Sequence, residues 1–122
     1  MRTDIAPLLT AHPGLLHRFR FVRMRFEIES SGERVRVHVD GPQVRVEQVS
    51  GEDREPCDFV LSAAATAWEE FKREFPRPGF NDILALVESG NASFSGDGLP
   101  FFRNLFVVKG ILSAVMRGDA RW

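Results

Sequence analysis

The sequence contains no tyrosine, although it has 11 phenylalanines and 2 tryptophans. Tyrosine is one of the side chains that donate protons or stabilise oxyanions in active sites, so its absence removes a common component from any catalytic interpretation. A phenylalanine side chain is wholly apolar and needs no hydrogen-bond partner when it is buried. The aromatic composition therefore favours apolar packing over polar chemistry.

The sequence also has a single cysteine and a net charge close to zero. Cys57 is the only cysteine, which excludes an intrachain disulfide and a cysteine-based metal cluster and indicates a reducing, cytoplasmic setting. The 16 basic and 17 acidic residues almost cancel, so no long-range field attracts polyanions and we expect no nucleic-acid partner. The 43% hydrophobic and 27% charged content is typical of a soluble globular protein.

The chain lacks a long uninterrupted hydrophobic run. Its most apolar region, Leu99–Met116, is broken by Arg103 and Lys109, whereas a transmembrane helix needs about 20 largely uncharged residues. The N-terminal residues 1–9 show no signal-peptide cleavage pattern. We therefore expect no stable membrane insertion. A length of 122 residues predicts one domain over residues 1–122, with a core at about residues 20–117.

The signatures of common enzymes are missing. There is no Gly-x-Ser-x-Gly elbow, no phosphate-binding glycine loop ending in Lys-Ser/Thr and no His-Glu-x-x-His. His12 and His17 lack a defined third metal ligand, and Cys57 is more readily explained as a structural residue than as a nucleophile paired with His38. We expect no catalytic residue, no metal and no cofactor.

The first half of the chain has the alternation of β-strands. Residues 22–30 and 34–40 each place apolar side chains on one face and charged side chains on the other, and Ser31-Gly32 suits a hairpin turn. This register sets Phe26 opposite Val37 and Glu27 opposite Arg36, so that opposite charges meet across the strands. A second turn at Gly41-Pro42 predicts a further strand.

The second half changes to a helical period. A loop over residues 50–56 and a short strand at 59–61 are followed by a helix that Ser62 is expected to cap. A shorter helix ends at Gly90, a strand closes at Gly96-Asp97, and a helix is predicted over about residues 99–117. The last helix has a wide apolar arc, which must be covered by protein, by lipid or by a ligand.

The order of these elements resembles the sterol carrier protein type 2 family. The run from Pro56 to Ala63, then Trp68, then the segment from Gly90 to Asp97 and an apolar final helix carry the resemblance, together with the meander from Phe26 to Val49. The ending Asp119-Ala120-Arg121-Trp122 is not a peroxisomal address, which favours a resemblance to stand-alone bacterial members.

The resemblance implies an α+β fold, in which a five-stranded, mostly antiparallel sheet is covered on one face by helices with an apolar tunnel between them. It also implies non-catalytic binding or transfer of a lipid: a fatty acid, fatty acyl-CoA, sterol or isoprenoid. From the inward faces above, we predict a lipid-binding wall of Phe26, Val37, Trp68, Phe71, Leu84, Phe94, Phe102 and Phe106. The final helix would act as a lid, and Arg18 and Arg20 are candidates for a head-group contact.

Two other functions remain open. The chain is an accessory or interaction domain if the apolar final helix packs on a partner or on a second copy in a homodimer. It is a small cavity enzyme of the ketosteroid-isomerase type if Asp82 or Asp97 serves as a base, although no tyrosine is present to complete the oxyanion site.

Overall fold

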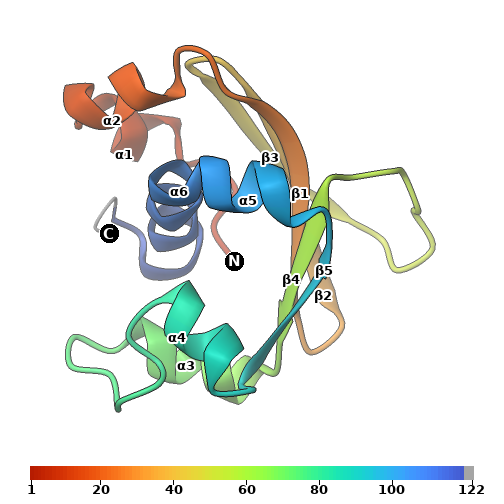
Figure 1. Cartoon of the computed structure of the whole chain (residues 1–122). Helices are drawn as coiled ribbons and strands as arrows, with labels where there is room; N and C mark the ends of the chain where they lie inside the picture. Colours follow the sequence, from red (N-terminus) through yellow and green to blue (C-terminus); the bar gives the residue numbers. More distant parts are fainter. Residues whose placement is uncertain (120–122) are drawn as a thin grey trace.

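The structure is a computed structural model that describes residues 1–119, so most of the C-terminal tetrapeptide considered above lies outside the described residues. Its framework is one sheet with the strand order β3-β2-β1-β4-β5 (Figure 1). The strands are β1 (Arg23–Ser30), β2 (Glu33–Asp40), β3 (Gln43–Val49), β4 (Phe59–Ala63) and β5 (Ala92–Gly96). Only the central pair β1–β4 is parallel among the described strands. The predicted five-stranded, mostly antiparallel sheet is confirmed.

The two predicted turns and their registers are confirmed. Phe26 lies opposite Val37 and Glu27 opposite Arg36, as the alternating pattern requires. Ser31 and Gly32 have φ values of 46° and 90°, the left-handed geometry of a tight hairpin turn that suits the twist of the strands. The turn at Gly41-Pro42 likewise joins β2 to β3.

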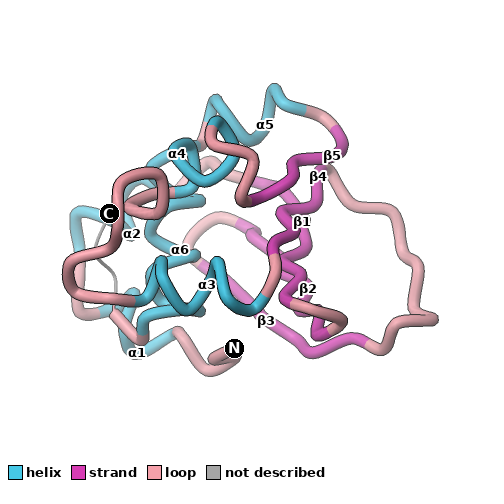
Figure 2. Tube along the Cα trace, turned by 90° about the horizontal axis from the view of Figure 1, so that it is seen from below, coloured by secondary structure: helices cyan, strands magenta, loops and turns pink. Residues whose placement is uncertain are grey.

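The helices of the described chain cover one face of the sheet, as Figures 1 and 2 show. They are α1 (Ala6–Thr10), α2 (Pro13–Phe19), α3 (Ala65–Lys72), α4 (Ile83–Glu88), α5 (Gly98–Arg103) and α6 (Leu105–Arg117). The predicted arrangement of helices on one face is confirmed. Apolar side chains from the inner face of the sheet and from the helices share one core. No helix in residues 1–119 is long and apolar enough to cross a membrane.

Helix α6 occupies the middle of the helical layer, between α1 and α2 on one side and α3 and α4 on the other (Figure 1). Its residues from Ile111 to Met116 are all buried. The wide apolar arc is therefore covered by the chain itself. Whether this helix acts as a lid, and whether the chain packs on a partner or a second copy, stay predictions.

Two local predictions about the helices differ from the structure, and two short helices were not predicted. Ser62 belongs to β4 and does not cap α3, whose first N–H, that of Ala65, donates instead to Ser31 Oγ at 2.7 Å. The helix predicted over residues 99–117 is two helices, because the chain leaves helical geometry at Asn104 (φ −115°, ψ 32°). The short helices α1 and α2 were not predicted, since neither is long enough to show a helical period.

A close backbone contact joins β5 to the start of β4. Gly96 has φ +112°, and a Cβ atom built on it would lie 2.5 Å from the carbonyl oxygen of Asp58 and 2.8 Å from the Cα of Phe59. The N–H of Asp97 donates to that same carbonyl at 2.8 Å. Only glycine fits this position, which lies directly before α5.

Candidate functional site

The inner face of the sheet brings together most of the predicted lipid-binding wall. Phe26, Val37, Trp68 and Phe71 are buried in the common core. Two further predicted residues, Leu84 and Phe94, are half-buried and pack against that core. The structure thus gathers six of the eight predicted residues into one apolar region between the sheet and the helices.

Phenylalanine rings form a continuous series from this region to the surface. Phe26 stacks on Phe59 with a centroid separation of 4.8 Å, and Phe59 meets Phe94 at 5.5 Å and Phe101 at 5.4 Å. Phe101 in turn contacts Phe102 at 5.0 Å. We call Phe26, Phe59, Phe94, Phe101 and Phe102 the aromatic series. It runs from the buried face of β1 to the exposed side of α5.

Phe102 and Phe106 lie outside the buried region. Their relative exposures are 63% and 49%, whereas Phe101 is buried. The expectation that both face inward is wrong, because Phe102 and Phe106 share a helical stripe with Lys109 and Ser113 and therefore lie in the polar arc of the final helix and not in its apolar arc. A contact of either ring with a lipid stays a prediction.

The two arginines predicted to contact a head group have different surroundings. The Arg18 guanidinium lies over the Phe106 ring, 4.9 Å from its centroid, and so meets one of the predicted wall residues. Arg20 instead donates from Nη1 to the carbonyl oxygen of His17 at 2.7 Å and lies over the ring of Phe21.

One small hollow borders the buried region. It has a volume of about 30 Å³ and lies between Phe71, Ile83, Leu112 and the side chain of Arg117. Because a water molecule needs roughly 10–15 Å³ of such space, this hollow has room for a few waters at most and not for an acyl chain. Binding of a long lipid would require the side chains of the region to move apart.

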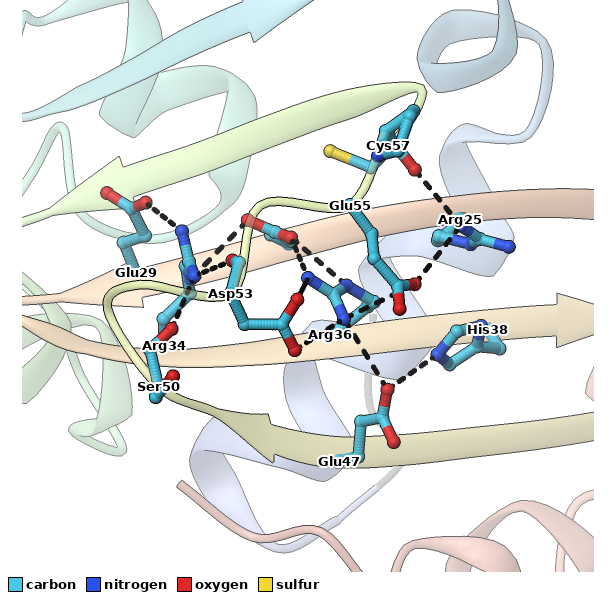
Figure 3. Close-up of polar contacts among 12 residues, drawn as sticks. Arg25, Glu29, Arg34, Arg36, His38, Glu47, Ser50, Asp53, Glu55 and Cys57 are labelled. Carbon is cyan, nitrogen blue, oxygen red and sulfur yellow. Dashed lines mark hydrogen bonds and ion pairs between the residues drawn. The ribbon is translucent and has the colours of Figure 1, made fainter.

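The outer face of the sheet carries a polar cluster that sequence reasoning did not identify as buried (Figure 3). Arg36 is only 1% exposed and Glu27 only 4%. Two nitrogens of Arg36, Nε and Nη2, each donate to Glu27 Oε2 at 3.1 Å, and Nη1 donates to Asp53 Oδ2 at 3.3 Å. Burial opposes the charge on Arg36, but its hydrogen bonds to Asp53 and Glu27 outweigh burial and raise its pKa.

The loop over residues 50–58 buries this cluster, and arginines of β1 and β2 hold the loop in place. Arg34 donates to the carbonyl oxygens of Ser50, at 2.6 Å, and of Asp53. Arg25 donates to the carbonyl oxygen of Pro56 at 3.1 Å. The predicted cross-strand pairs exist, but a loop distant in sequence removes two of their arginines from water. The alternation of apolar and charged residues along β1 and β2 does not indicate that the loop over residues 50–58 will cover these arginines.

A histidine–carboxylate contact at the edge of the cluster makes stability depend on pH. His38 Nε2 lies 3.0 Å from Glu47 Oε1, and Arg45 donates to Glu47 Oε2 at 2.9 Å. The hydrogen bond with His38 is the main reason why the pKa of Glu47 is lowered, against the opposing effect of burial. The ionised carboxylate therefore stabilises the fold above its unfolded pKa, and this contribution is lost as pH falls through the folded pKa.

We expect the difference in unfolding free energy between the wild type and Glu47→Gln to shrink between about pH 6 and about pH 3, because glutamine does not titrate. Urea unfolding at several pH values measures this difference. Glu52→Gln is the control, since Glu52 is exposed and forms no ion pair among residues 1–119. A difference that stays constant across this range would contradict the assignment.

The groups considered for catalysis have structural partners. Asp82 and Asp97 accept hydrogen bonds from the N–H groups of Ala85 and Leu99, which caps α4 and α5. The Cys57 thiol donates to the carbonyl oxygen of Phe59 at 3.5 Å, and burial raises its pKa, which disfavours the reactive thiolate. No group of three metal-ligating side chains occurs within the described residues.

The fold of this chain is similar to that of several solved structures. No protein-family model and no curated protein matches the sequence. A Thermus thermophilus protein proposed to be a sterol carrier protein matches with a TM-score of 0.69 at 15% identity, over 98% of this chain and 86% of that one. The ubiquinone synthesis protein UbiJ-SCP2 gives 0.59 at 19% identity over 88% of each chain. Apo sterol carrier protein 2 from Yarrowia lipolytica gives 0.51 at 12% identity, over 92% of this chain and 86% of that one.

Proposed function

We propose that this chain, which has the sterol carrier protein 2 fold, binds and transfers a hydrophobic small molecule without catalysing a reaction. The ligand classes are those of the family resemblance: fatty acids, fatty acyl-CoA, sterols and isoprenoids. The observation that carries the proposal is the aromatic series, which joins the buried region between the sheet and helices to the surface at α5.

The binding energy would come from desolvation. Each methylene group that leaves water for an apolar site contributes about 0.8 kcal/mol, so ten buried methylenes give about 8 kcal/mol before the costs of ordering the ligand. Since the region is packed in the structure, a ligand would displace the half-buried side chains at its margin, such as Leu84 and Phe94. No acid, base or metal is needed for this process.

Mass spectrometry of an organic extract of the purified protein, against a matched blank, tests the proposal directly. We expect a fatty acid, sterol or isoprenoid in about stoichiometric amount. A protein extracted empty should take up a fluorescent fatty acid, and ligand at 100 times its Kd should raise the unfolding free energy by about 2.7 kcal/mol. An empty extract together with no uptake would contradict lipid binding, and light scattering would then test for a homodimer.

A charged substitution within the aromatic series tests the location of the site. We expect Phe94→Asp to reduce fatty-acid affinity strongly, because a carboxylate next to a bound acyl chain would lose its hydration. Ser95→Asp is the matched control, since Ser95 is exposed on the opposite face of the same strand. Circular dichroism verifies folding, and Phe94→Ala replaces the aspartate variant if the latter unfolds. Equal affinities for the Phe94 and Ser95 variants would place the ligand elsewhere.

A further inference from the structure

The exposed apolar side chains of this protein are concentrated at the junction of α5 and α6. Leu99, Phe102 and Phe106 are three of the five exposed large hydrophobic residues of the described chain. Leu99 and Phe102 are three residues apart on α5 and therefore lie on the same side of it. A single exposed apolar residue needs no explanation, but a group of three within eight residues marks a contact surface.

Two arginines lie beside these exposed apolar side chains. Arg18, from α2, lies over the ring of Phe106, and Arg103 follows Phe102 in α5. Arg18, Arg103 and Phe106 line one shallow hollow of about 180 Å³. Both arginines are exposed, and neither forms an ion pair with any residue in the range 1–119. We call Arg18, Leu99, Phe102, Arg103 and Phe106 the junction surface.

The distribution of charge along the sequence isolates this surface from carboxylates. Residues 5–26 contain four arginines and residues 98–118 contain two arginines and one lysine, and neither segment has an acidic residue. All but two of the 17 acidic residues lie between Glu27 and Asp97. Asp97, the carboxylate nearest to α5 in sequence, accepts the hydrogen bond that caps that helix. Arg23, Arg25 and Lys109 of these segments form ion pairs with carboxylates from elsewhere in the chain, whereas Arg18 and Arg103 do not within residues 1–119, so unpaired positive charge lies beside the exposed phenylalanines.

We propose that the junction surface docks on the surface of a bilayer that contains anionic phospholipid. Arginine guanidinium groups bind lipid phosphates and carboxylates, while Phe and Leu side chains enter the boundary between head groups and acyl chains. A second copy of this chain would not match as well, because it would bring four unpaired arginines into one interface to which the junction surface contributes no carboxylate. The proposal does not depend on the identity of a cargo lipid, although the aromatic series ends at Phe102 within this surface.

Co-sedimentation with vesicles tests the proposal without any cargo ligand. We expect the protein to bind phosphatidylcholine vesicles that contain phosphatidylserine more tightly than vesicles of phosphatidylcholine alone, and to be released by added salt. Each arginine near an anionic membrane contributes about 1 kcal/mol, so the double variant Arg18→Gln/Arg103→Gln should bind about 30-fold more weakly. Phe102→Glu should also weaken binding.

Two exposed residues away from the junction surface provide matched controls. Arg54 lies on the loop over the other face of the sheet and forms no ion pair among the described residues, and Phe75 is 84% exposed in the segment that follows α3. Arg54→Gln and Phe75→Glu should bind vesicles as the wild type does. Absence of wild-type binding to anionic vesicles would overturn the proposal.

Three further results would overturn it as well. They are equal binding to both kinds of vesicle, equal losses in the control variants, and a wild-type dimer in light scattering that Phe102→Glu dissociates. Because these measurements use protein without added lipid cargo, they can fail while fatty-acid uptake succeeds, and the reverse also holds.

Discussion

Replacing Arg36 with methionine is expected to lower the free energy of unfolding by about 3–5 kcal/mol, the usual effect of removing one partner of a buried ion pair. Glu27 would then be a buried carboxylate without its two hydrogen bonds from Arg36, and Asp53 would lose its attachment to the sheet. Methionine keeps much of the apolar stem of arginine, so the loss reports mainly on the charge. Urea unfolding measures the change.

Arg23→Met is the matched control for this prediction. Arg23 lies on the same outer face and pairs with Asp40, but both side chains are largely exposed. An exposed ion pair contributes about 0–1 kcal/mol, so this variant should be almost as stable as the wild type. The double variant Arg36→Met/Glu27→Leu should recover part of the loss, because it removes the buried carboxylate that Arg36→Met alone leaves without its two hydrogen bonds. A similar loss in the Arg36 and Arg23 variants would contradict the importance of burial.

Replacing Gly96 with alanine is expected to destabilise the fold by several kcal/mol. A side chain at φ +112° is strained by about 1–3 kcal/mol, and forcing extra volume into a packed site costs about 1–3 kcal/mol more. The atoms that the new Cβ would meet belong to the backbone of Asp58 and Phe59, which cannot rotate away as a side chain can. The pairing of β4 with β5 and the start of α5 would both shift.

Thermal unfolding of Gly96→Ala and Gly51→Ala separates this effect from the general loss of a glycine. Gly51 has no atom within 4 Å of an added Cβ, and its φ is not positive. Gly51→Ala should therefore change stability by no more than about 0.5 kcal/mol. Equal stabilities for the two variants would show that β4 and β5 can separate at little cost.

The sheet was predictable because its signals are local. Alternation sets which side chains face inward, and the cross-strand charge pairs select the register that places Glu27 opposite Arg36. The position of the Phe26 side chain follows from this alternation, and that of Trp68 from the helical spacing of the apolar residues in α3. No alternating pattern, in contrast, indicates that residues 50–58 fold back over Arg34 and Arg36.

The helical layer was predicted less fully than the sheet, because α1 and α2 are too short to show a helical period. The chain leaves helical geometry at Asn104, which ends α5 and begins α6, while Phe101 is buried and Phe102 and Phe106 are exposed. A helical projection at about 100° per residue places Phe102 and Phe106 beside Lys109, so their exposure was predictable, whereas the break at Asn104 was not. The approach of Arg18 to Phe106 could be recognised only from the structure, although the absence of acidic residues in the two segments of the junction surface was visible in the sequence.

The position of β1 between β2 and β4 has a consequence for how the fold forms. The meander β1-β2-β3 joins strands that follow each other directly, so its contacts have a low contact order. The parallel pair is different, because Phe26 lies beside Phe59 only after the chain between them has closed a large ring. Closure entropy must be lost before that pairing stabilises the chain. We therefore expect β4 to pair with the open edge of the meander more slowly than the strands of the meander pair with one another.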